Sequence, residues 1–150
     1  MKLSGTQELR ARPGDVWAFL NDPQRLVRCL PGCEKLEPAG ADRYRAKVKF
    51  GLAAITGEYV GEVVYAEKKP PTAMRLRVEG KGTPGFMKAE GRLELSETKG
   101  GTQVAYEGDA QVGGLIASVG QRMIEAAARK IIQQFFECAG KELKAVHRQK

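Results

Sequence analysis

The sequence predicts an α+β fold in which one curled antiparallel sheet lies against a single long C-terminal helix. Apolar residues recur every three or four positions over 113–146, which is the spacing of one helix face. The preceding residues 34–112 instead alternate apolar and polar side chains between turn sequences, as half-buried strands do. The chain has 150 residues, of which 42% are hydrophobic, a size typical of one core. We therefore expect a single domain over residues 1–150.

The first part of the chain predicts one strand and two short helices. Residues 2–11 alternate in the manner of a half-buried strand. Pro13 suits the first turn of a short apolar helix, and Asp22 followed by Pro23 is a capping residue before a second one, which should end at Pro31-Gly32. The two helices thus form a crossover between the first and second strands.

Six more strands are expected between the second short helix and the long helix. Proline and glycine turn sequences separate them and favour an antiparallel meander. With the first strand they make a seven-stranded sheet, and their predicted ranges are 34–38, 42–50, 54–67, 73–82, 87–97 and 102–112.

The predicted inward face of the sheet is apolar but carries many glycines and alanines. A packed interior tolerates few voids, so either the long helix approaches this face closely or the sheet and helix enclose a cavity. Strand glycines also mark the bulges and bends that curl a sheet, and a curled sheet leaves room inside. Gly113, Gly114 and Ala117 thin the start of the helix. Gly120 is expected in the helix interior, where glycine costs about 1 kcal/mol relative to alanine.

The N-terminus and the cysteines predict a cytoplasmic protein without a metal. The chain opens without a long apolar run, so neither a signal peptide nor a membrane-spanning helix is expected. Three cysteines, an odd number, fit a reducing compartment better than a disulfide framework. Cys29 and Cys33 could form a redox pair, although packing thiols are the favoured interpretation. Together with Cys138 and His147 they match no common zinc spacing.

The net charge of +7 does not by itself identify a partner. No basic stripe is interleaved with exposed aromatic residues, so nucleic-acid binding is not expected. Basic residues do gather at the C-terminus, where the helix dipole and a binding surface are equally good explanations. These residues are Lys141, Lys144, Arg148 and Lys150.

The sequence lacks the residues of the common catalytic sites. The one histidine, His147, lies four residues from the end of the chain, and there is neither a G-x-S-x-G elbow nor a phosphate-binding glycine loop. The carboxylates that could act as bases point outward in the predicted sheet, which favours a surface role. They are Glu58, Glu62, Glu90 and Asp109. No catalytic residue is therefore assigned.

Several short motifs, taken together, resemble the carbon monoxide dehydrogenase G-subunit family over about residues 1–139. The motifs are Asn21-Asp22-Pro23, Cys29-Leu30-Pro31-Gly32-Cys33-Glu34, Gly51-Leu52-Ala53, Ile55-Thr56-Gly57-Glu58-Tyr59 with Gly61, the run Tyr106 to Gly114, and Ala117-Ser118-Val119-Gly120-Gln121-Arg122. The resemblance implies a START-like, helix-grip fold, in which a curled sheet wraps a long C-terminal helix around a hydrophobic cavity.

The same resemblance implies an accessory role. Such proteins serve molybdenum-containing carbon monoxide dehydrogenases and related hydroxylases, attach the enzyme to the membrane and handle a lipophilic acceptor such as a quinone. Many carry a C-terminal anchoring extension, which is not expected here because the chain ends at Lys150. The basic tail could instead touch an anionic surface reversibly, at the inner face of the membrane.

We therefore expect a non-enzymatic carrier whose cavity holds a quinone or a lipid, with no other cofactor and no metal. The expected lining residues are Val48, Phe50, Ile55, Tyr59, Met74, Leu76, Met87, Tyr106, Ile116, Val119, Gly120 and Met123. Apolar burial would drive binding, and Tyr59 or Tyr106 would orient the ligand. Two other interpretations stay open: a maturation factor that recruits the molybdoenzyme through Leu30–Cys33 without a physiological ligand, and a small enzyme of the cyclase or hydratase kind.

Overall fold

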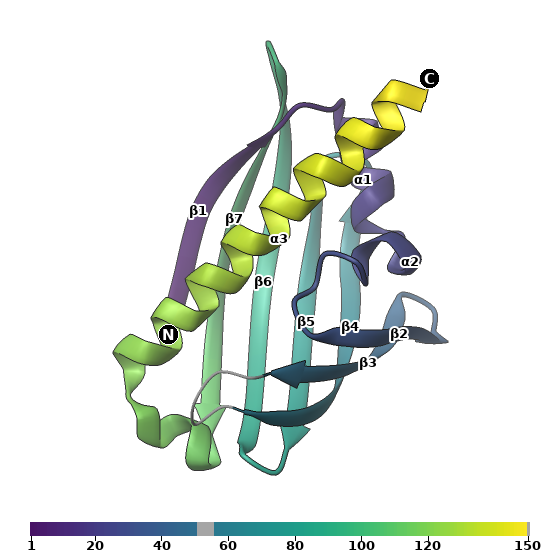
Figure 1. Ribbon diagram of the computed structural model, residues 1–150. Helices are drawn as coiled ribbons and strands as arrows, with labels where there is room; N and C mark the ends of the chain where they lie inside the picture. Colours follow the sequence, from purple (N-terminus) through teal and green to yellow (C-terminus); the bar gives the residue numbers. More distant parts are fainter. Residues whose placement is uncertain (51–55, 150) are drawn as a thin grey trace.

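A computed structural model of the chain describes residues 1–50 and 56–149. Its strands form one antiparallel sheet of seven strands in the order β1-β7-β6-β5-β4-β3-β2, and the long helix α3 crosses one face of it diagonally (Figure 1). The elements are β1 (Lys2–Leu9), α1 (Pro13–Leu20), α2 (Pro23–Leu26), β2 (Cys33–Gly40), β3 (Arg43–Phe50), β4 (Gly57–Lys69), β5 (Ala73–Gly82), β6 (Gly85–Thr98), β7 (Gly101–Gly113), the 3-10 helix η2 (Gly114–Val119) and α3 (Gln121–Gln149). The predicted fold class is confirmed.

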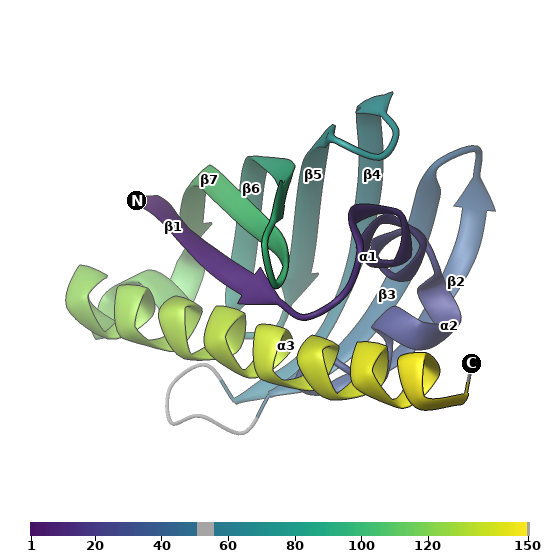
Figure 2. The same ribbon diagram turned by 90° about the horizontal axis from the view of Figure 1, so that it is seen from above.

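The two short helices lie on the same face of the sheet as α3 (Figure 2). Pro13 is the first residue of α1, and the Asp22 side chain accepts a hydrogen bond from the backbone N–H of Gln24 at 3.1 Å, as the capping pattern predicts. The helix α2 ends at Leu26, however, and a turn rather than a helix continues toward Pro31.

The predicted continuous helix over 113–146 is wrong at its start. The strand β7 continues to Gly113, η2 follows, and α3 begins only at Gln121. Gly114 and Gly120 have φ angles of 78° and 95°, which side chains other than glycine rarely adopt, so both break a regular helix. Gly120 therefore lies between two helices and not inside one. The N–H of Ile116 donates to the Pro84 carbonyl at 2.9 Å and fastens η2 to the β5–β6 turn.

The densest packing lies where α1, α2 and the later turns of α3 meet the sheet. Phe19 and Val16 of α1 are fully buried and belong to one core cluster with Val104 of β7 and Met74 of β5, which are 0% and 2% exposed. The Tyr65 hydroxyl donates to the Leu20 carbonyl at 2.8 Å, which ties β4 to the end of α1. Burial raises the pKa of Tyr65 because ionisation would place a charge in this core.

The expectation that the cysteines are unpaired is wrong. Cys29, in the turn that follows α2, forms a disulfide with Cys138 of α3 across 109 residues of sequence, and Cys33 is the free cysteine. Neither the favoured interpretation of packing thiols nor the alternative Cys29–Cys33 redox pair describes this arrangement. Arg28 and Glu142 form an ion pair at 3.5 Å beside the disulfide, so the residues after α2 are fastened to α3 at two neighbouring points.

Candidate ligand-binding site

The inward face of the sheet carries a continuous floor of small and medium side chains. The strand register places its residues in three neighbouring rows that run across the sheet. The rows are Ala46, Gly61, Gly80, Met87 and Val112; then Tyr44, Val63, Val78, Ala89 and Ala110; then Tyr65, Leu76, Gly91, Gly108 and Leu3. We call these fifteen positions the inner floor.

The inner floor is less buried than the packed core beside it. All of its residues except Ala46 and Tyr65 keep part of their surface exposed, although they lie on the same inward face of the sheet as the core residues. The next rows contain Met74, Leu95 and Val104, which are only 2%, 5% and 0% exposed. Because apolar side chains aimed at α3 stay accessible, the space between α3 and the floor is incompletely filled.

The glycines of the sheet serve two different purposes. A Cβ atom on Gly61 would lie 2.4 Å from the Glu79 carbonyl oxygen, and one on Gly82 would lie 2.2 Å from that of Glu58. These two glycines therefore permit a close approach of neighbouring strands and curl the sheet. Gly80 differs, because its Cβ would touch only the Met87 Cγ, at an ordinary 3.7 Å. At this position the missing side chain leaves room in the interior.

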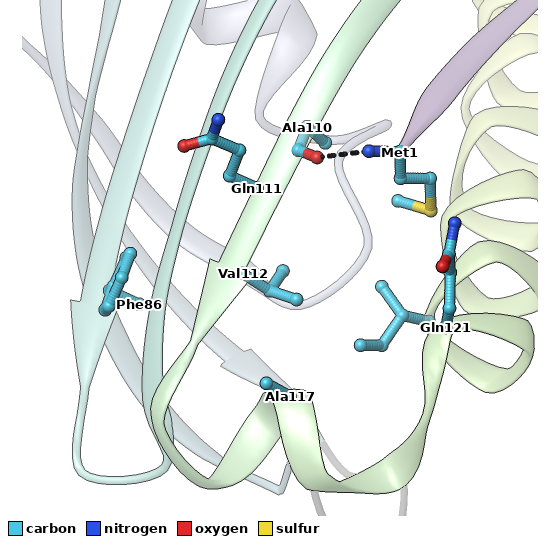
Figure 3. Close-up of a pocket in the computed structure, with 8 residues that line it drawn as sticks. Met1, Phe86, Ala110, Gln111, Val112, Ala117 and Gln121 are labelled. Carbon is cyan, nitrogen blue, oxygen red and sulfur yellow. Dashed lines mark hydrogen bonds between the residues drawn. The ribbon is translucent and has the colours of Figure 1, made fainter.

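A pocket of about 450 Å³ lies where the floor ends beside β1. It sits between the end of β7, η2 and the first turns of α3, and Figure 3 shows Val112, Met1 and Gln121 converging on it. Its lining residues are Met1, Phe86, Ala110, Gln111, Val112, Ala117, Gln121 and Ile124. The Met1 ammonium group closes one side, since it donates to the Ala110 carbonyl at 2.9 Å and lies 3.2 Å from the Asp109 carboxylate.

The predicted lining residues lie in several environments. Leu76 and Met87 belong to the inner floor, Tyr106 lies in the next row toward the core, and Val48 and Phe50 lie with Tyr59 near the opposite end of the sheet, where the Phe50 and Tyr59 rings are 5.9 Å apart. Met74 belongs to the core, Ile116 is buried under the β5–β6 turn, and Val119 is half-buried. Gly120 and Met123 are exposed, the latter by 59%, and Ile55 lies outside the described residues.

None of the twelve predicted residues lines the pocket of Figure 3, and their role in binding stays a prediction. Ala110 and Val112 could have been predicted from the sequence, because the alternation of side chains along β7 places both on the inward face of the sheet. Ile124 was missed because Met123 and Ile124 are adjacent apolar residues of the predicted helix, and only the structure shows that Ile124 lines the pocket while Met123 is exposed.

A second hollow of about 510 Å³ lies between the end of β1, the β6–β7 turn and the later part of α3. Leu9 and Phe136 contribute its apolar surface, and charged residues of both signs surround them. Its lining residues are Glu8, Leu9, Arg10, Gly100, Phe136, Glu137, Gly140 and Lys144. The mixed charge gives this hollow no clear preference for an anion or a cation.

The carboxylates considered as bases occupy the outer face, as predicted. Glu58 pairs with Lys49 at 3.4 Å, Glu62 with Arg43 at 2.8 Å, Glu90 with Arg77 at 3.2 Å, and Asp109 with the Met1 ammonium group. These carboxylates are 43–71% exposed, so they form ordinary surface ion pairs.

The interior offers phenols rather than paired acids and bases. Burial raises the pKa of Tyr59 as well as that of Tyr65, so both phenols stay neutral at physiological pH. Within residues 1–50 and 56–149, no cluster of histidine, cysteine and carboxylate side chains is suited to hold a metal ion. In the same part of the chain, no helix is both long enough and apolar enough to cross a bilayer.

The curled sheet, the diagonal helix and the apolar interior between them define a START-like, helix-grip protein. A START superfamily protein from Mycobacterium smegmatis superposes with a TM-score of 0.76 at 12% identity and covers 97% of this chain and 98% of its own. The Chromobacterium violaceum protein CV1439 superposes with a TM-score of 0.72 at 16% identity, and the match covers 94% of this chain and 96% of that protein.

The chain belongs to the carbon monoxide dehydrogenase G-subunit (CoxG) family, whose model matches residues 5–144. A conserved protein from Geobacillus kaustophilus is 38% identical, with a TM-score of 0.94 and 97% and 96% of the two chains covered. No curated protein matches the sequence significantly.

Proposed function

We propose that the protein is a non-enzymatic accessory protein of a molybdenum-containing carbon monoxide dehydrogenase or a related hydroxylase. It binds a quinone or a lipid between α3 and the inner floor and thereby links the enzyme to the membrane. The observation that supports binding is the residual exposure of the floor beside a fully buried core. Membership of the CoxG family supports the choice of enzyme.

Apolar burial would drive the binding of such a ligand. Val63, Val78 and Met87 are half-buried and would lose their remaining accessible surface to a bound chain. Each Å² of apolar surface removed from water contributes about 25 cal/mol. The pocket of about 450 Å³ beside Val112 is of the size of small-molecule sites, which begin at about 300 Å³.

Native mass spectrometry of protein purified without detergent tests the carrier function. A carrier should retain a lipophile, and organic extraction followed by mass spectrometry should identify it as a quinone or a lipid. Protein that is free of lipophile, and that also takes up none from quinone-containing vesicles, would overturn the proposal.

The link to a membrane can be tested separately from ligand binding. The side chains of Lys141 and Lys144 are exposed near the C-terminus, and each such cation near an anionic surface contributes about 1 kcal/mol. The protein should therefore sediment with phosphatidylglycerol vesicles at low salt and less with phosphatidylcholine vesicles. Equal sedimentation with both would contradict an electrostatic contact.

A second function, that of an interaction or maturation factor without a physiological ligand, is supported by exposed apolar residues near the pocket. Leu115 of η2 is 67% exposed and Met123 of α3 is 59% exposed. Affinity purification from cells, with Leu115→Ser and Met123→Ser as variants, separates the two functions. A maturation factor would capture the hydroxylase through these residues when no lipophile is bound, whereas a carrier would hold a lipophile with or without the enzyme.

A further inference from the structure

Arg25 of α2 carries a buried guanidinium nitrogen without a partner. Its Nη2 atom is inaccessible to solvent and makes no hydrogen bond, and its guanidinium carbon lies 5.1 Å from the centre of the Phe19 ring. Within the described part of the chain, no carboxylate forms an ion pair with Arg25. Arg28, one turn later, is 64% exposed and pairs with Glu142. Arg25 as a whole is only half-buried, but a buried nitrogen donor is normally satisfied, so Nη2 lacks an acceptor that another molecule could supply.

Asn21 supplies a second unsatisfied atom in the same corner of the fold. Its Nδ2 group donates to the Trp17 carbonyl at 2.9 Å, which fixes the orientation of the amide, and its Oδ1 atom is left buried without a donor. Among the described residues, Oδ1 of Asn21 and Nη2 of Arg25 are the two buried side-chain atoms without a partner. One is an acceptor and the other a donor, so the donor can bind an oxygen atom of a ligand and the acceptor can bind a hydroxyl group or a water molecule beside it.

Arg25 is linked to α3 through the Phe19 ring of α1. Arg28 meets Glu142 and Cys29 meets Cys138, whereas Arg25 stacks on Phe19, whose ring is 6.2 Å from that of Phe135. Arg25 is thus connected to α3 through the Phe19 ring at Phe135, three residues before Cys138.

A row of aromatic rings continues from this corner across the interior. Phe135 lies 5.2 Å from Phe136, and Phe136 stacks on Tyr106 of β7 at 5.9 Å. Tyr106 stands in the sheet directly beside Gly5 and Leu93, in the row next to the inner floor. The guanidinium of Arg25 thus lies at one end of an apolar wall that borders the floor.

We propose that Arg25, together with Asn21, holds the oxygen-bearing end of the lipophile whose apolar part lies on the inner floor. The ligand is then a long apolar molecule that ends in a hydrogen-bond acceptor, either a quinone carbonyl or a carboxylate. Arg25 Nη2 donates to that oxygen, and Asn21 Oδ1 accepts from a hydroxyl group or a water molecule held beside it. This inference rests on the proposed carrier function and adds the chemistry of the ligand's polar end.

Calorimetric titration with three probes tests the inference: decylubiquinone, dodecanoate and the hydrocarbon dodecylbenzene. Arg25→Met keeps the length of the side chain and removes its donors, and Arg28→Met is the matched surface control. We expect Arg25→Met to lower the affinity for at least one oxygen-bearing probe about 10- to 100-fold, as the loss of a hydrogen bond from a charged donor predicts. Dodecylbenzene should bind within about twofold of its wild-type affinity, because it makes no such bond. Weaker binding of decylubiquinone would identify the acceptor as a carbonyl, and weaker binding of dodecanoate would identify it as a carboxylate.

Two results would overturn the inference alone. They are unchanged binding of both oxygen-bearing probes to Arg25→Met, and an equal loss for all three probes, which would indicate a structural role. If Arg25→Met does not fold by circular dichroism, Arg25→Lys replaces it; the retained charge should give an intermediate affinity, and full loss of all three probes would count against the inference. Failure of wild-type protein to bind any probe would overturn the carrier function and this inference with it.

Discussion

Filling the space above Gly80 should weaken ligand binding strongly without unfolding the protein. Gly80→Leu adds four carbon atoms to the inner floor, and its Cβ would touch only the Met87 side chain, at 3.7 Å. These four carbons occupy the room of about four methylene groups of a ligand, and each buried methylene contributes about 0.8 kcal/mol. The lost burial of about 3 kcal/mol corresponds to a roughly 200-fold weaker affinity.

Titration with decylubiquinone measures the loss of affinity, and urea unfolding measures how much the Gly80→Leu substitution changes the stability. The matched control is Glu79→Leu, which places the same side chain one residue earlier on the outer face, where it should leave the affinity unchanged. If the interior were already packed, the leucine would cost about 1–3 kcal/mol of unfolding free energy through overpacking. Such a cost together with unchanged binding would refute the open interior.

Two further predictions concern the core. Because the Cys29–Cys138 disulfide closes a loop of 109 residues, its reduction should lower the unfolding free energy by up to about 4.7 kcal/mol. Cys33→Ser should have no such effect, and equal melting temperatures with and without dithiothreitol would contradict the pairing. Tyr65→Phe leaves the buried Leu20 carbonyl without its donor and should cost about 1–3 kcal/mol in urea unfolding. Burial raises the pKa of Tyr65 above its ordinary value of 10.0, so the unfolded chain ionises first and stability should fall above about pH 10, by up to 1.4 kcal/mol per pH unit for each such phenol. Tyr65→Phe should flatten this slope, and an equally steep slope in the variant would assign it to other groups.

The architecture could be predicted because its determinants are local. Alternation along each strand and proline or glycine turns between strands define a meander whatever the rest of the chain does. The Asp22-Pro23 capping pair likewise marks the start of α2 without reference to distant residues.

Features that depend on distant contacts could not be predicted in the same way. Cys29 and Cys138 come together only because the turn after α2 lies against α3, and nothing in their spacing of 109 residues indicates this. The unsatisfied nitrogen of Arg25 is equally invisible in the sequence, where Arg25 and Arg28 look alike as basic residues around a short helix.

Glycine shows most clearly what the sequence alone cannot predict, because this one residue type serves several structural purposes. Gly61 and Gly80 are paired across neighbouring strands, yet a Cβ on the first would collide with backbone, whereas a Cβ on the second would meet only the Met87 side chain in ordinary contact. Sequence parity predicts that both point inward, but only the positions of the surrounding atoms distinguish curvature from a cavity.

Gly120 provides a test in which the sequence interpretation and the structure predict opposite signs. In the interior of a continuous helix, Gly120→Ala would stabilise the protein by about 1 kcal/mol. In the structure Gly120 has a φ angle of 95° with no atom within 4 Å of an added Cβ, so the substitution should cost about 1–3 kcal/mol through backbone strain alone. Gly14 of α1 is the matched control, because it has equally open surroundings and no positive φ, and Gly14→Ala should stabilise by about 0.4–1 kcal/mol. If urea unfolding showed that both substitutions stabilise the protein, the result would support a continuous helix and contradict the break at Gly120 that precedes Ile124.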